Sequence, residues 1–199
     1  MNTKALLLLR YTLILALFAL GWVIAPATAA GSDAAPAGQF FHALQQLCGK
    51  RFAGGIVADQ PPPAADDPFT SRALEMHVRD CSADEVRIPF AVGEDRSRTW
   101  VITRTATGLR LKHDHRHSDG TPDALTMYGG DTVAPGTAQR QSFPADAETL
   151  TLFKAQDRAV SLTNVWALEL VEGRYFIYEL ARPTGRLFRV RFDLADTAP

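Results

Sequence analysis

Three of the five histidines in this 199-residue chain alternate along one short segment, at His113, His115 and His117. Alternate side chains of a strand lie on the same face, about 6.6–6.8 Å apart, so these imidazoles would share a face with Leu109 and Leu111. Neutral imidazole is a common zinc ligand, and a catalytic zinc site typically combines three protein ligands with a water. The spacing therefore indicates a site for zinc or another divalent metal, which a nearby carboxylate could complete: Asp114, Asp119 or Asp131.

The same segment also fits a polar ligand site without a metal. Arg104 has the strand parity of Trp100 and Ile102, so it would point to the buried side. Arginine and histidine together suit a carboxylate or phosphate group, because both donate hydrogen bonds to anionic oxygens. Under this hypothesis His113, His115 and Arg104 bind an anionic head group. A third interpretation is structural, with the histidines hydrogen-bonded to nearby aspartates that order the hairpin.

Two further candidate residues lie in an apolar row later in the chain. The row is expected to be the inward face of one long strand, and it consists of Val160, Leu162, Asn164, Trp166, Leu168 and Leu170. Asn164 is polar on an apolar face, so its amide needs a partner from the core, from water or from a ligand. Asn164 and Trp166 are therefore candidate ligand contacts.

The elements that must position these residues are mostly strands. From residue 73 onward apolar residues recur with period two, most clearly over 74–78, 86–92 and 188–194. Turn signals such as Asp119-Gly120 and Glu172-Gly173 separate the runs at spacings typical of consecutive hairpins. Before them, the apolar spacing over 40–48 predicts one helix, and no further helix is expected.

One short helix followed by an antiparallel meander is best accommodated when the sheet closes into a barrel. A barrel removes the exposed strand edges that would otherwise pair with other chains. The pattern therefore predicts an all-β protein with an antiparallel up-and-down β-barrel of about 9–11 strands and one short N-terminal helix. The alternative is a β-sandwich.

The first residues have the features of a secretory signal peptide. Lys4 and Arg10 precede an apolar run over 11–25, and Ala27-Thr28-Ala29 offers small residues for cleavage. The run is shorter than the roughly 20 residues that span a bilayer, so no stable transmembrane anchor is expected after cleavage. We expect a signal peptide over 1–29, a flexible leader over 30–38 and one domain over 39–195, exported to the periplasm or secreted.

Charge and cysteine content narrow the function classes. The net charge is −1, which argues against a nucleic-acid binder. Cys48 and Cys81 are the two cysteines. In an oxidising compartment they would form one disulfide, whereas the alternative is two buried free thiols.

In its element order the chain over residues 40–194 resembles the calycin group, which comprises lipocalins, fatty-acid-binding proteins and haem-binding nitrobindin-like barrels. Gly49-Lys50-Arg51-Phe52 stands where lipocalins carry Gly-x-Trp after a short helix, one residue longer and with Phe for Trp. Arg189 or Arg191 on the last strand is similar in position to the lipocalin arginine at the barrel base. The resemblance implies a barrel that encloses a small ligand.

We therefore expect an exported β-barrel that binds a small molecule, amphipathic or anionic, at a His- and Arg-lined polar end. An enzyme that uses a metal on the histidine strand is the first alternative, and as cofactor a divalent metal is preferred to haem. The second alternative is a cell-envelope interaction scaffold without a ligand. An open cavity at His113, His115 and Asn164 would favour binding, whereas a filled core would favour the scaffold.

Overall fold

The computed structural model describes residue 33 and residues 35–195. The expected signal peptide over 1–29 lies outside the described residues, and so do residues 30–32 and 34 of the expected leader over 30–38. Helix α1 (Pro36–Gln45) already includes residues 36–38. Proline is well suited to a first helical turn, because its missing N–H would have no partner there. None of the helices in the described part of the chain is long and apolar enough to cross a membrane.

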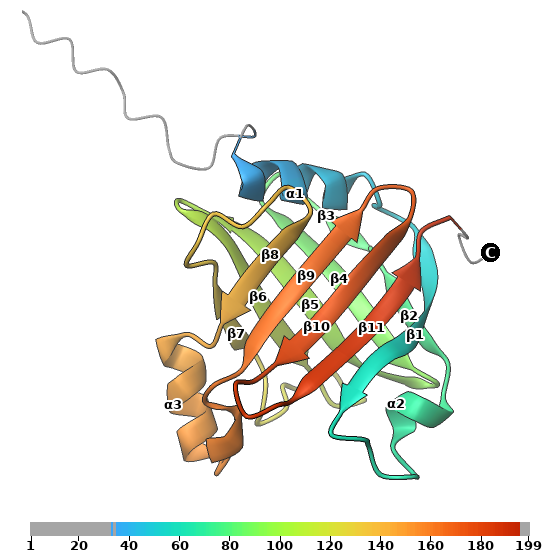
Figure 1. The fold of residues 1–199 in the computed structure, drawn as a ribbon, viewed down its shortest axis with the longest axis vertical. Helices are drawn as coiled ribbons and strands as arrows, with labels where there is room; N and C mark the ends of the chain where they lie inside the picture. Colours follow the sequence, from blue (N-terminus) through green and yellow to red (C-terminus); the bar gives the residue numbers. More distant parts are fainter. Residues whose placement is uncertain (1–32, 34, 196–199) are drawn as a thin grey trace, which may run out of the picture.

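Antiparallel strands form one sheet that is nearly closed into a barrel (Figure 1). Most successive strands pair with each other, and the first strand pairs with the last, which confirms the predicted all-β up-and-down barrel. The strands are β1 (Arg51–Gln60), β2 (Leu74–His77), β3 (Asp80–Cys81), β4 (Glu85–Val92), β5 (Asp95–Thr105), β6 (Gly108–His115), β7 (Tyr128–Asp131), β8 (Arg140–Pro144), β9 (Val165–Val171), β10 (Tyr175–Ala181) and β11 (Leu187–Asp193).

The alternating runs form strands with one buried face, as the period of two predicts. Val86, Ile88 and Phe90 of β4 are buried, and so are Val190 and Phe192 of β11. The predicted row from 160 to 170 is wrong in its first half, because β9 begins only at residue 165. The segment before it is a short turn of 3-10 helix, η1 (Ala159–Ser161), in which Val160 is 67% exposed.

Two further helices, α2 (Pro68–Ser71) and α3 (Ala147–Ala155), contradict the expectation of a single helix. Each begins at an aspartate whose carboxylate accepts a hydrogen bond from a first-turn backbone N–H. Asp67 accepts from Phe69 and Asp146 from Thr149, each at 2.8 Å. Such caps stabilise short helices by pairing N–H groups that have no partner within the helix. Both helices lie at the barrel end opposite α1 (Figure 1).

Helix α1 covers the other end of the barrel. Its side chains Phe40, Phe41 and Leu44 are fully buried in the core. Just after the helix, Cys48 forms a disulfide with Cys81 of β3. The predicted disulfide is thus present, and it ties the covering helix to the barrel wall.

The barrel closes between β7 and β8, where one glycine permits a close backbone approach. A Cβ atom on Gly130 would lie 1.8 Å from the carbonyl oxygen of Pro144. Beside it, the Thr149 hydroxyl of α3 accepts from the backbone N–H of Gly129 at 2.7 Å and donates to its carbonyl at 2.8 Å. The backbone N–H of Asp146 also donates to Gly129. Glycine and a short helix thus complete the wall where no strand ladder does.

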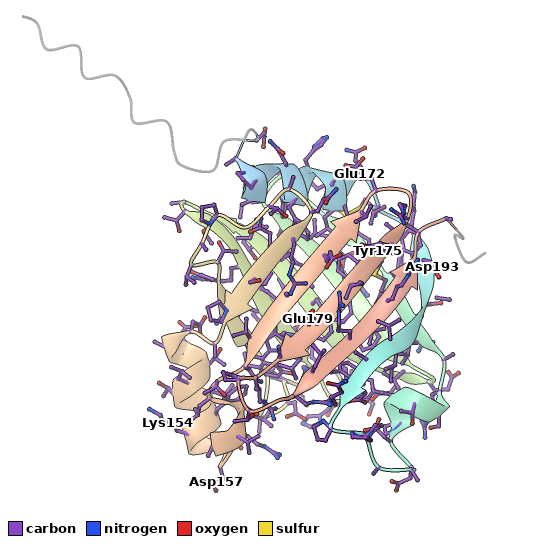
Figure 2. All side chains as sticks on the ribbon, in the orientation of Figure 1. Lys154, Asp157, Glu172, Tyr175, Glu179 and Asp193 are labelled. Atoms are coloured by element: carbon purple, nitrogen blue, oxygen red, sulfur yellow. A yellow bond between two sulfur atoms is a disulfide. The ribbon has the colours of Figure 1, made fainter. Side chains whose placement is uncertain are left out.

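Aromatic rings fill the barrel interior. The Trp100 ring stacks between Phe90 and Tyr178, at centroid distances of 4.8 and 4.5 Å. The outer face is charged instead: Arg189 pairs there with Glu169 and with Glu179, which Figure 2 labels on β10. Arg191, the other candidate for a base-closing arginine, pairs with Asp193 on the same surface. Neither arginine closes the barrel.

Candidate functional site

Two adjoining cavities lie at the barrel mouth opposite α1. One has a volume of about 220 Å³ and the other about 420 Å³. They share the side chains of His115, Tyr128, Tyr178 and Leu180 in their walls. Strands β6, β7 and β10 therefore supply the common wall, whereas α2 borders the smaller cavity and η1 the larger one.

His113 lies at the inner end of the smaller cavity and is 3% exposed. Its Nδ1 is 3.1 Å from the Tyr128 carbonyl oxygen, which can only accept, so Nδ1 carries the proton. In the neutral ring Nε2 then accepts from the Tyr178 hydroxyl at 2.9 Å. Burial lowers the pKa of His113 to about 3, and the same burial raises the pKa of Tyr178 well above its usual value. His113 and Tyr178 thus form the floor of this cavity, as two uncharged and hydrogen-bonded groups within an aromatic core.

His115 lies one step closer to solvent, and its ring faces both cavities. Its Nε2 is 3.0 Å from the Tyr128 hydroxyl. Burial, together with the positive charge of Arg98, lowers the pKa of His115, so the ring is neutral at pH 7. Burial raises the pKa of Tyr128 to about 12, so its hydroxyl keeps its proton. His115 and Tyr128 thus contribute uncharged hydrogen-bonding groups to the mouth.

The wall of the smaller cavity is aromatic. Phe69 of α2 contacts Phe188 edge-on, with 5.5 Å between ring centroids, and lies 6.2 Å from Phe90. Two arginines cover these rings: the guanidinium of Arg98 is 5.2 Å from the Phe69 centroid, and that of Arg186 is 5.4 Å from the Phe188 centroid. Each has a carboxylate partner, Asp95 for Arg98 and Asp59 for Arg186. The pocket can therefore enclose an apolar group below a polar rim, in which carboxylates balance the charges of the two arginines.

The larger cavity contains the two residues predicted from the apolar row, Asn164 and Trp166. Trp166 is buried and lies 5.1 Å from the His113 ring centroid. Asn164 has the partner that its burial requires, because its Oδ1 accepts from Arg182 Nε at 2.5 Å. Arg158 also lines this cavity, from the turn after α3.

The structure separates the remaining predicted site residues from the mouth. Arg104 does have inward parity, but β5 carries it to the α1 end, where it pairs with Asp33 and covers the Phe41 ring. His117 follows the end of β6 and is exposed, with Nδ1 4.0 Å from Asp123. In the part of the chain that the structure describes, no three His, Cys, Asp or Glu side chains are grouped to hold a metal.

The carboxylates proposed beside the histidines serve other partners. Asp114 is buried on the outer face of β6, where Arg87 and Arg116 bind it at 2.9 and 3.1 Å. Asp131 pairs with Arg110. Ring nitrogens of His113 and His115 therefore contact tyrosine hydroxyl groups and not aspartates, whereas the structural interpretation expected aspartate partners.

Several lining residues were not predicted from the sequence, although the alternation pattern indicated two of them. Arg98 has the same parity as Trp100, and Tyr178 has the parity of the buried Phe176. The alternation therefore already directed both inward. Phe69 and Arg182 had no such signal, because one lies on a four-residue helix and the other follows β10 in a turn.

A third cavity, of about 690 Å³, lies at the α1 end. Its polar lining groups are exposed on the surface, among them Gln39, His42 and Glu172. Figure 2 shows Glu172 in the turn beside α1. This third cavity lacks a buried polar lining group comparable to His113, so the barrel mouth is the stronger candidate site.

Comparison with known proteins adds no family to these observations. No family model, no curated protein and no solved structure matches the chain.

Proposed function

We propose that this protein is an exported small-molecule-binding module whose ligand occupies the barrel mouth. The observation that carries the proposal is the pair of adjoining cavities with His115, Tyr128 and Tyr178 at their common wall and His113 at the inner end of the smaller one. Apolar enclosure with a few placed polar groups is the usual composition of a ligand site. The predicted signal peptide and the Cys48–Cys81 disulfide support export to an oxidising compartment.

The packed interior restricts the size of the ligand. Trp100, Phe176 and Phe192 occupy the space that a deep lumen would need. Since a dry cavity of about 150 Å³ accommodates benzene, the smaller pocket of about 220 Å³ suits one aromatic ring or a short branched chain. The ligand is therefore smaller than a fatty acid or a haem and binds at the barrel end.

Calorimetry with 3-phenylpropanol, a neutral single-ring probe, tests the proposal. We expect saturable binding in roughly the millimolar range or tighter, since small ligands gain limited free energy per atom. Leu180→Trp places an indole in the wall shared by both cavities and should weaken binding at least about tenfold. Val57→Trp is the matched control, because Val57 is exposed and lines neither cavity.

A second variant guards against a folding defect in Leu180→Trp. Phe69→Ala removes one aromatic wall on the short helix α2 without filling the pocket, and it should also weaken binding. If the wild-type protein and all three variants give the same saturable heats, the ligand does not bind in the mouth. If none of them gives saturable heat, the scaffold alternative gains support from the filled core.

A further inference from the structure

Two arginines in the larger mouth cavity differ in their partners from the arginines at the smaller pocket. Arg98 and Arg186 are paired with carboxylates at the smaller pocket. Arg182 and Arg158 line the larger one, and within residues 35–195 neither forms an ion pair with an Asp or Glu side chain. The cavity therefore contains cationic groups whose charge the surrounding protein does not neutralise.

Arg182 is held in place by neutral groups. Its Nε donates to Asn164 Oδ1 at 2.5 Å, and its Nη2 donates to Ser161 Oγ at 3.4 Å. These bonds fix the plane of the guanidinium without balancing its charge. Burial and the nearby charge of Arg186 lower the pKa of Arg182, which shows that its surroundings disfavour the cation. An anion in the cavity would remove that disadvantage.

Asp123 is the carboxylate that lines the same cavity, and it is already engaged. Its Oδ1 accepts from the backbone N–H of Leu125 at 2.7 Å, and its Oδ2 faces His117 at 4.0 Å. His115 is neutral, because burial lowers its pKa. Two arginines against one carboxylate leave the cavity positive, which favours anions over neutral or cationic ligands.

We propose that the larger cavity is an anion subsite, in which Arg182 and Arg158 bind the carboxylate or phosphate of a ligand whose small apolar stem occupies the adjoining aromatic pocket. This inference rests on the proposed function, because it assigns the two ends of one ligand to the two cavities. The two cavities share Leu180 and Tyr178 as lining residues, so a short ligand that extends past these side chains would contact both. The ligand class is a single-ring or similarly small organic anion.

Calorimetric titration with three matched probes tests the subsite: 3-phenylpropionate, its primary amide and benzyl phosphate. We expect the wild-type protein to bind at least one anion about tenfold or more tightly than the amide, as charge-assisted hydrogen bonds allow. Whichever anion is tighter identifies the head group. Raising the salt concentration should reduce the preference for the anion and leave amide binding unchanged.

Arg182→Gln should remove most of the preference for the anion while the amide binds as before. Arg158→Gln, at an exposed position, should reduce it in a chain whose fold is undisturbed. Arg174→Gln is the matched control, because Arg174 is exposed in the turn between β9 and β10 and lines neither cavity. Circular dichroism of each variant checks that the barrel is intact.

The outcomes separate this inference from the proposed function. If the amide and both anions bind the wild-type protein equally, the anion subsite is overturned while the binding function stands. If the preference for the anion persists in both Arg182→Gln and Arg158→Gln, the anion binds elsewhere and the assignment is wrong. If no probe binds, the proposed function fails together with the subsite.

Discussion

His113 shows how one buried residue determines the chemistry of the mouth. Its two ring nitrogens are satisfied by the carbonyl of Tyr128 and the hydroxyl of Tyr178, so the ring is locked in one neutral tautomer. Protonation would place a positive charge on a ring that is 3% exposed, and this burial lowers the pKa of His113. The floor of the site is therefore built for neutral hydrogen bonding and is sensitive to acid.

Acid should destabilise the protein through His113. The unfolded ring binds a proton near pH 6.5, whereas the native ring stays neutral down to about pH 3. Between these values the unfolded state binds more protons, so the free energy of unfolding falls as the pH falls, by up to about 1.4 kcal/mol per pH unit. Urea unfolding of the wild type and of His113→Gln, from about pH 7.5 to pH 4, should give a flatter profile for the variant. Parallel profiles would contradict the claim that the buried, neutral His113 makes the protein less stable in acid.

The parity of β6 predicted that His113 and His115 point inward, but the sequence did not reveal their partners. Tyr128 and Tyr178 belong to other strands, so their meeting with the histidines depends on register and barrel closure. The same dependence on strand register limited what the sequence could predict for Arg104. Its inward direction was predicted, whereas its distance from the histidines follows from the antiparallel pairing of Arg104 with Leu109 and of Arg98 with His115.

At the scale of elements, the strands were predictable and the short helices were not. Alternation identified β2, β4 and β11 because each has one buried face. The apolar row over 160–170 suggested one strand, but its early members belong to η1 and the following turn. An available signal for α3 was Asp146 as a cap three residues before Thr149, followed by Leu150 and Phe153. That helix completes the wall at the seam between β7 and β8.

The seam gives a prediction at this scale. Gly130→Ala should cost about 3 kcal/mol of unfolding free energy or more, because the added methyl group would overlap the Pro144 carbonyl. Gly55→Ala in β1 is the matched control, since a Cβ there meets nothing within 4 Å, and it should change stability by less than about 0.5 kcal/mol. Equal effects of the two variants in denaturant unfolding would show that the seam does not depend on this close approach.

At the scale of the whole molecule, the barrel has one covered end and one open end. Helix α1 and the disulfide cover the first, while α2, α3 and η1 surround the mouth (Figure 1). The aromatic core between them separates the two ends. A change at the covered end should therefore alter stability more than binding.

Removal of the disulfide tests this separation. Cys48→Ala/Cys81→Ala opens a loop with a sequence separation of 33 residues, and the chain-entropy estimate for such a loop is about 3–4 kcal/mol of lost stability. Thermal unfolding measures that loss. Below the unfolding transition the double variant should bind 3-phenylpropanol as the wild type does. A large loss of affinity in the folded variant would show that the two ends are coupled.

The central claim is that the ligand occupies the mouth, and an NMR titration of the isotope-labelled protein with 3-phenylpropanol tests it most directly. The account predicts saturable shifts of backbone amides at the shared wall, at His115, Tyr128 and Leu180, with none at Gln39 or His42 in the cavity beside α1. Shifts confined to the α1 end, or shifts that do not saturate at any site, would contradict it.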